Sequence, residues 1–173
     1  MRAAYVTALA LTGIVGASFV WATPVQAAVA PCTGDRMTAR VTDTDAGMSE
    51  QIAYVTVRNR ARKRCYVSGY PYLARVVAKD GSKVFTQVRG GTALAQNPSR
   101  KRIILKRGQR AHFVIGTSTA YDTKPITLRR IRFAPAPGVT PISVDVRLDV
   151  DRADGQPYRL TTTAYAPGAG KVP

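Results

Sequence analysis

Apolar and polar residues alternate with a period of two along most of the chain after residue 27, a pattern typical of half-buried β-strands. The clearest example is ISVDVRLDV (142–150), in which Ile142 and every second residue after it are apolar and the residues between them are polar. Apolar residues after the N-terminal stretch do not repeat at the spacing of an amphipathic helix. The pattern therefore predicts an all-β domain.

Turn-forming residues separate the alternating segments. Asp-Gly, Gly-Gly and Asn-Pro pairs lie between several of them. The last two segments are joined by RADGQ and are predicted to form an antiparallel hairpin. Many short strands without helices between them predict an antiparallel β-sandwich with Greek-key connections. The predicted strands span residues 37–43, 52–59, 65–69, 72–80, 83–88, 101–106, 110–116, 129–135, 142–150 and 157–165.

The two ends of the chain differ from the region between them. Residues 1–27 combine Arg2, nineteen uncharged residues and a small-residue cleavage pattern, so they are predicted to be a helical secretory signal peptide. An uncleaved membrane anchor is the alternative, because nineteen uncharged residues almost suffice to span a bilayer. No later segment could span a membrane. We expect one β-sandwich domain over residues 28–165 and a disordered tail over residues 166–173.

The sequence contains two cysteines, Cys32 and Cys65, both after the predicted signal peptide. An even number of cysteines in an exported chain suggests a disulfide. A lipid anchor on Cys32 would require a small residue where Pro31 stands, and it would leave Cys65 as a free thiol. A cysteine nucleophile needs a nearby histidine base, and a zinc site needs more ligands than this sequence offers. We therefore expect Cys32 and Cys65 to form a disulfide.

Positive charge is the strongest compositional signal. The chain has 26 Lys and Arg against 10 Asp and Glu, a net charge of +16, and a pI near 10.6. Such a charge attracts anions and also keeps a protein soluble, which is the alternative explanation. Arginine predominates, and its planar fork pairs with phosphate and carboxylate. Three clusters form the predicted anion-binding set: Arg58, Arg60, Arg62, Lys63 and Arg64; Arg100, Lys101, Arg102, Lys106, Arg107 and Arg110; and Arg129, Arg130 and Arg132.

The sequence offers little chemistry for catalysis. Its single histidine, His112, lies in RAHFVIG, where alternation places Ala111, Phe113 and Ile115 on the buried face and His112 on the polar face. Nothing in the sequence places a serine beside it, as Ser-His-Asp catalysis requires. The carboxylates of DVDRADG lack the spacing of a calcium loop. We expect no enzymatic activity, no cofactor and no metal site.

Several motifs resemble those of one protein family. The segments YVTVRNRARKRCYVSGYP, AKDGSKV and IILKRGQRAHFVI resemble the secreted actinobacterial proteins grouped as domain of unknown function 4232. The pattern consists of an early cysteine, a strand ending in Asn, a second cysteine and a Gly-Tyr-Pro corner, between Cys32 and about Ile115. The resemblance implies an immunoglobulin-like β-sandwich in which Cys32 is joined to Cys65. It implies no activity.

Two of these motifs also have a local explanation. Asn59 follows a strand and tolerates a left-handed turn there. Gly69-Tyr70-Pro71 is predicted to redirect the chain at a corner, because the proline fixes its own φ and restricts the residue before it. The alternative is that Tyr70 and Tyr72 form an aromatic binding pair.

These observations predict an exported, non-enzymatic binding module that is secreted and associated with the cell envelope. The expected partner is an anionic envelope polymer or lipid headgroups. An acidic protein, or a partner that adds a strand at a sheet edge, is the second candidate. An unrecognised hydrolase is the third. Nucleic acid is disfavoured because the chain is expected outside the cell and lacks aromatic residues interleaved with its basic strands.

The exported protein should begin at or near Ala28. N-terminal sequencing of the protein recovered from culture supernatant measures this directly. Recovery only from membranes, with Met1 retained, would contradict both the cleavage and the free secretion.

Overall fold

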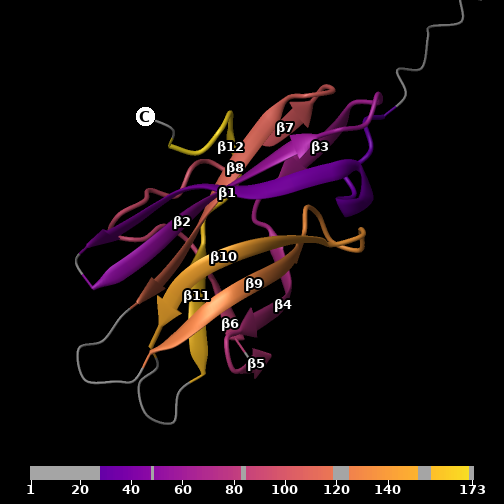
Figure 1. The fold of residues 1–173 in the computed structure, drawn as a ribbon. Helices are drawn as coiled ribbons and strands as arrows, with labels where there is room; N and C mark the ends of the chain where they lie inside the picture. The colour runs from indigo at the N-terminus through magenta and orange to yellow at the C-terminus, as the bar shows by residue number, and fades with distance from the viewer. Residues whose placement is uncertain (1–27, 48, 83–84, 119–124, 152–156, 172–173) are drawn as a thin grey trace, which may run out of the picture.

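The structure is a computed structural model that describes residues 28–47, 49–82, 85–118, 125–151 and 157–171 (Figure 1). The predicted signal peptide lies outside these ranges. A 3₁₀ helix, η1 (Gly34–Arg36), precedes the first strand. Every predicted strand segment overlaps an observed strand, which confirms the all-β prediction. The strands are β1 (Met37–Gly47), β2 (Glu50–Asn59), β3 (Cys65–Ser68), β4 (Tyr72–Ala78), β5 (Gly81–Ser82), β6 (Phe85–Arg89), β7 (Arg102–Leu105), β8 (Arg110–Ser118), β9 (Ile126–Ala134), β10 (Ile142–Val150), β11 (Tyr158–Thr162) and β12 (Ala166–Pro167).

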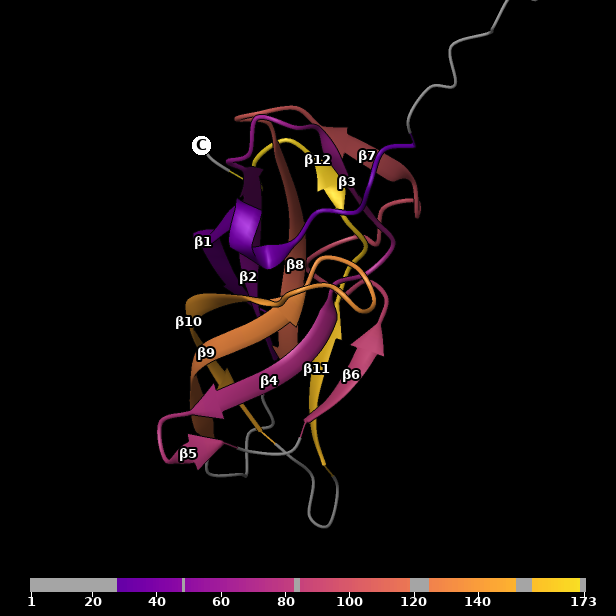
Figure 2. The same ribbon diagram turned by 90° about the vertical axis from the view of Figure 1, so that its right-hand side faces the viewer.

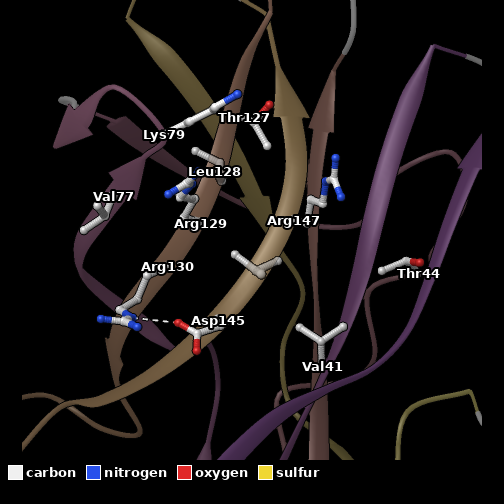
Figure 3. A pocket seen from close by; sticks show the side chains of 11 residues that line it. Val41, Thr44, Val77, Lys79, Thr127, Leu128, Arg129, Arg130, Asp145 and Arg147 are labelled. Carbon is white, nitrogen blue, oxygen red and sulfur yellow. Dashed lines mark hydrogen bonds and ion pairs between the residues drawn. The ribbon is translucent and has the colours of Figure 1, made fainter.

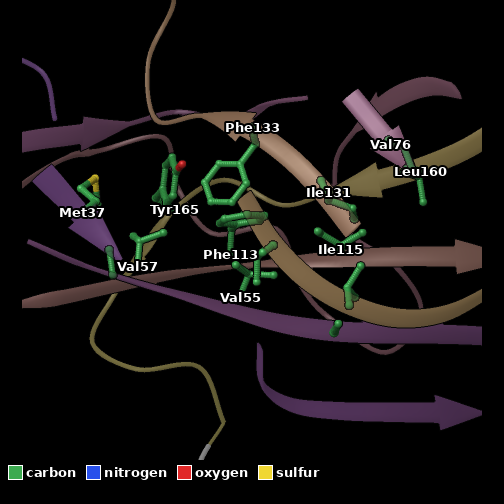
Figure 4. Packing of buried hydrophobic residues seen from close by; sticks show 14 of the residues in the cluster. Met37, Val55, Val57, Val76, Phe113, Ile115, Ile131, Phe133, Leu160 and Tyr165 are labelled. Atoms are coloured by element: carbon green, nitrogen blue, oxygen red, sulfur yellow. The ribbon is translucent and has the colours of Figure 1, made fainter. Parts of the chain in front are cut away.

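Two facing sheets enclose the core (Figures 1 and 2). The six-stranded sheet has the order β1-β2-β8-β11-β6, with β12 also paired to β8, and the four-stranded sheet has the order β10-β9-β4-β5. Strands β3 and β7 pair separately. The Phe113 ring from β8 lies 4.8 Å from Phe133 of β9 and 5.3 Å from Tyr165, in edge-on contacts (Figure 4). Because both sheets contribute side chains to one core, the β-sandwich prediction is confirmed.

The predicted hairpin between residues 142–150 and 157–165 is wrong. Strand β10 pairs with β9 in the four-stranded sheet. Strand β11 lies in the other sheet, parallel to β6 and antiparallel to β8. Alternation shows that a strand buries one of its faces. It does not show to which sheet the strand belongs, because the inner faces of both sheets pack against the same apolar core. Both segments therefore satisfy the pattern without pairing with each other.

The predicted disordered tail is wrong for the residues that the structure describes there, 166–171. Strand β12 pairs with β8, and the chain then runs over the outer face of the six-stranded sheet. The Gly170 N–H donates a hydrogen bond of 3.0 Å to Thr56 Oγ1. A Cβ atom on Gly170 would lie 2.7 Å from the Cβ atom of Tyr54, so glycine is required for this close approach.

The predicted disulfide between Cys32 and Cys65 is present, with the two Cα atoms 4.9 Å apart. The Cys32 N–H donates to the Tyr66 carbonyl at 2.8 Å, and the Tyr66 N–H donates to the Ala30 carbonyl at 3.1 Å. The N-terminal segment therefore lies alongside β3. Both cysteines are buried in the main core cluster, so the bridge fixes the N-terminal segment and β3 to the sandwich.

Replacing Cys65 with Ser should lower the free energy of unfolding by about 3 kcal/mol, because the bridge no longer restricts the unfolded chain. Urea denaturation followed by circular dichroism measures the loss. Cys32→Ser is the matched control and should give a similar loss, since the same bridge is absent from both variants. Unchanged stability in both, or two free thiols in the oxidised wild-type protein, would contradict the prediction.

Candidate anion-binding surfaces

A buried asparagine holds two basic loops together at one end of the sandwich. The Asn59 side-chain amide donates to the carbonyls of Lys63 (3.0 Å) and Leu105 (2.8 Å), and its oxygen accepts the Ala61 N–H at 2.9 Å. The Asn59 backbone is bonded to Gln109 and Gly108. Asn59 ends β2 and does not use the left-handed turn that asparagine tolerates, because Ser49 is the one non-glycine residue with positive φ among those described. Asn59 instead connects the β2–β3 loop with the β7–β8 turn.

The structure brings together parts of the first two predicted clusters and separates the third. Residues 58–64 and 106–110 meet at the end organised by Asn59, and Arg58 lies directly opposite Arg110 in the pairing of β2 with β8. Arg129, Arg130 and Arg132 lie on β9 in the other sheet. The three clusters therefore do not share one face, because the strands that carry them belong to different sheets.

Two arginines of the second cluster are stacked on tyrosine rings. The Arg102 guanidinium carbon lies 4.1 Å from the Tyr66 ring centre, and that of Arg100 lies 5.2 Å from the Tyr70 ring centre. Arg89, outside the predicted set, lies 5.1 Å from the centre of the Tyr72 ring. Cation–π contacts of this kind hold a guanidinium in place. These arginines therefore have a structural partner within the protein.

The predicted corner at Gly69-Tyr70-Pro71 is confirmed. Gly69 has a φ of 64°, and its carbonyl accepts the Tyr165 N–H at 2.8 Å. Tyr70 is buried, and its hydroxyl accepts a hydrogen bond of 2.7 Å from Asn97. The buried ring is part of the corner, which disfavours the alternative of an aromatic binding pair with Tyr72.

A groove of about 1000 Å³ lies where the outer part of the four-stranded sheet meets β1 (Figure 3). Its lining contains four cations, Lys79, Arg129, Arg130 and Arg147, and one carboxylate, Asp145. Val41, Thr44, Val77, Thr127, Leu128 and Val146 complete it. Lys79, Arg129 and Arg147 form no ion pair within the described residues. The groove is therefore strongly positive, and the sequence clusters identified only its two β9 arginines.

Irregular strand pairing explains why adjacent arginines both reach this groove. The pairing of β4 with β9 shifts register between Val77 and Ala78 and passes over Arg129 of β9. The pairing of β9 with β10 also passes over Arg129. Arg129 and Arg130 are consequently both exposed although they are neighbours in one strand. Arg130 Nε donates to Asp145 Oδ1 at 2.7 Å, and this hydrogen bond raises the pKa of Arg130.

A smaller hollow of about 160 Å³ lies on the outer face of the six-stranded sheet. It is lined by Thr38, Arg40, Thr56, Arg58 and Arg110. Arg58 and Arg110 were predicted as anion-binding residues from their clusters. Arg40 stands alone in the sequence and was missed, although the alternation in MTARVTD places it and Thr38 on the polar face of their strand.

The comparison with known families agrees with the motifs that surround Asn59 and the corner. A family described as Domain of unknown function (DUF4232) matches residues 32–166. The chain belongs to this family. The match begins at Cys32 of the disulfide and ends in β12, so it covers nearly all of the described sandwich. No curated protein and no solved structure matches the chain.

His112 of this DUF4232 domain faces away from the core, as the alternation predicted. It is half-buried, its Nδ1 lies 3.4 Å from the Gly168 carbonyl oxygen, and burial lowers its pKa. Its ring lies 6.3 Å from that of Tyr54. The hydrogen bonds of the described residues connect His112 to a backbone carbonyl and not to a side-chain hydroxyl. Within the same residues, no helix has the length and apolarity needed to cross a membrane.

Replacing Asn59 with Ala should lower the free energy of unfolding by roughly 3 kcal/mol, because three hydrogen bonds are lost and buried backbone groups lose their partners. Asn97→Ala is the comparison. Asn97 also makes bonds through both ends of its amide, to Tyr70 and Ala164, but it is exposed, so water can replace them. Urea denaturation measures the loss of unfolding free energy in each variant, provided that the m-value is unchanged. An equal or smaller loss at Asn59 would contradict its role in joining the loops.

Proposed function

We propose that this DUF4232 protein is an exported, non-enzymatic module with an immunoglobulin-like sandwich, which attaches to an anionic polymer or to lipid headgroups of the cell envelope. The observation that carries the proposal is the positive groove lined by Lys79, Arg129, Arg130 and Arg147. A charged groove of about 1000 Å³ is open enough to accept an extended chain and to concentrate anions near its walls.

The charge around the groove supports binding of a ligand with repeated negative groups. One of the four cations, Arg130, is engaged by Asp145, and the other three have no carboxylate partner among the described residues. These three cations are not neutralised by the described carboxylates, so an anionic ligand can pair with them.

The disulfide supports the exported part of the proposal. Disulfides persist in oxidising compartments such as the cell exterior and are rare in the cytosol. Secretion and retention at the envelope by charge are therefore compatible with the Cys32–Cys65 bridge and with a basic groove. An acidic protein partner remains the second candidate, and binding to isolated polymer and vesicles distinguishes it.

Replacing Lys79, Arg129 and Arg147 together with Gln should weaken binding to a phosphate-repeat polymer, or to phosphatidylglycerol vesicles, by about 100-fold. Each basic residue near an anionic surface contributes about 1 kcal/mol. Co-sedimentation at low ionic strength measures the affinity. Binding of the wild-type protein should also fall steeply as salt is added, because exposed charges are screened over a Debye length of about 8 Å at physiological ionic strength.

The matched control replaces Arg62, Lys63 and Arg64 with Gln, which removes the same charge from the β2–β3 loop outside the groove. It should weaken binding by less than about tenfold if the groove is the contact surface. Equal losses in the two variants would reject the groove in favour of overall charge. No loss in either variant would reject both the groove and the β2–β3 loop as contact surfaces. Absence of binding by the wild-type protein would reject anion binding and favour an acidic protein partner.

A further inference from the structure

The hollow on the six-stranded sheet is built from two neighbouring rows of side chains across β1, β2 and β8. In the first row, Thr38 lies opposite Arg58, which lies opposite Arg110. In the second row, Arg40 lies opposite Thr56. Directly opposed residues have Cβ atoms roughly 5 Å apart, so three guanidinium groups surround one small space. This space has a volume of about 160 Å³.

The charge in this hollow is not neutralised by the protein. Within the described residues, Arg40, Arg58 and Arg110 form no ion pair, and the lining contains no carboxylate. Arg58 and Arg110 are like charges in directly opposed positions, an arrangement that costs stability. A bound anion would convert this repulsion into attraction, because charge-assisted hydrogen bonds from guanidinium groups are strong.

The turn beside the hollow positions one of the guanidinium groups. Arg58 Nε donates to the Gly108 carbonyl at 3.2 Å. Gly108 has a φ of 83°, and a Cβ atom there would lie 3.4 Å from Arg58 Nη2. The glycine therefore lets the turn adopt its left-handed conformation with the guanidinium close against it. Because Arg58 Nε donates to the turn, the two Nη atoms of Arg58 remain to bind a ligand.

The floor of the hollow is held by hydrogen bonds of its own. Thr42 Oγ1 donates to the Tyr54 carbonyl at 3.3 Å, so the Thr56 hydroxyl donates to Thr42 Oγ1 at 3.0 Å. Thr56 Oγ1 also accepts the Gly170 N–H. Thr56 is 2 % exposed, and its hydroxyl proton is already used. The donors that remain for a ligand are the three guanidinium groups and the exposed Thr38 hydroxyl.

We infer that this hollow binds a single phosphate group, presented either free in solution or as part of a lipid headgroup. A phosphate offers several acceptor oxygens in a tetrahedral arrangement, which suits guanidinium groups that approach from three strands. A carboxylate offers two oxygens in one plane and can accept hydrogen bonds from fewer of these guanidinium groups. The volume holds one such group with a few waters, since a water occupies about 30 Å³. The inference goes beyond the proposed function and does not depend on the groove of the other sheet.

Isothermal titration of the purified protein with inorganic phosphate, at constant low ionic strength, tests the site. The wild-type protein should show one saturable site. Arg40→Gln and Arg110→Gln should each weaken binding by about tenfold, because each removes a charged donor. Arg58→Lys keeps the charge but loses the fork, so it should weaken binding by a smaller factor of about three. Arg40 is exposed on the edge strand β1, so its variant should fold normally.

Three controls make the result specific. Arg62→Gln removes the same charge outside the hollow and should change the affinity by less than about twofold, and an effect equal to that of Arg40→Gln would overturn the inference. Acetate should bind more weakly than phosphate, and equal affinity would overturn the assignment to phosphate. The triple groove variant should bind phosphate normally, so loss of polymer binding and loss of phosphate binding can be told apart.

Nuclear magnetic resonance identifies the place and the source of the phosphate. His112 is the single histidine and lies opposite Thr56, so its ring resonances should shift as phosphate is added. Shifts centred on residues 127–130 instead would overturn the location. Vesicles of phosphatidylglycerol in phosphatidylcholine should displace inorganic phosphate if the group belongs to a lipid. If they do not displace it, the ligand is a soluble phosphate. Absence of any saturable phosphate site would overturn the inference entirely.

Discussion

The contact between the two sheets at Phe113 is the constraint on which the remaining structure depends. Phe113 lies on β8, a central strand of the six-stranded sheet, and its ring meets Phe133 from the opposite sheet and Tyr165 after β11. Side chains on the inner faces of both sheets fill this core, so the charged residues must occupy the outer faces and loops. Because 25 of the 26 Lys and Arg residues and all 10 Asp and Glu residues follow residue 27, positive surfaces on both sides of the sandwich result.

Departures from regular pairing shape these surfaces further. In β9, a register shift exposes Arg129 together with Arg130. In β1, a shift between Val41 and Asp43 changes which residues face the core. Regular alternation alone would place one residue in two on each face. The irregular positions therefore concentrate cations in the groove beyond what strict alternation allows.

The sequence predicted local structure well because local structure depends on alternation and turn chemistry, which lie in short segments. It failed where the answer depended on distant partners. The segments 142–150 and 157–165 each bury one face, and nothing within them specifies which sheet supplies their hydrogen bonds. Residues 166–171 look disordered by composition, but Gly170 is needed because Tyr54 lies so close to it.

The same distinction applies to the candidate sites. Clusters along the chain revealed Arg58 and Arg110, yet they lie next to one another because β2 pairs with β8, and no short motif encodes that pairing. Arg40 and Thr38 join them through the pairing of β1 with β2. A cluster in the sequence also does not show contacts within the protein, since Arg100 and Arg102 are held over tyrosine rings. Charge density along the chain is the basis of the anionic ligand that we propose, and strand register decides which of the cations lie together.

Strand β1 takes part in both positive surfaces. Val41 and Thr44 line the groove, whereas Thr38 and Arg40 line the hollow. Thr38 and Arg40 lie on the opposite face of the strand from Val41, because side chains alternate along it. A large anion in the groove therefore leaves the hollow open to solvent. The two surfaces therefore do not compete for the same space, whereas an anion bound at one weakens the electrostatic attraction of the other for a second anion.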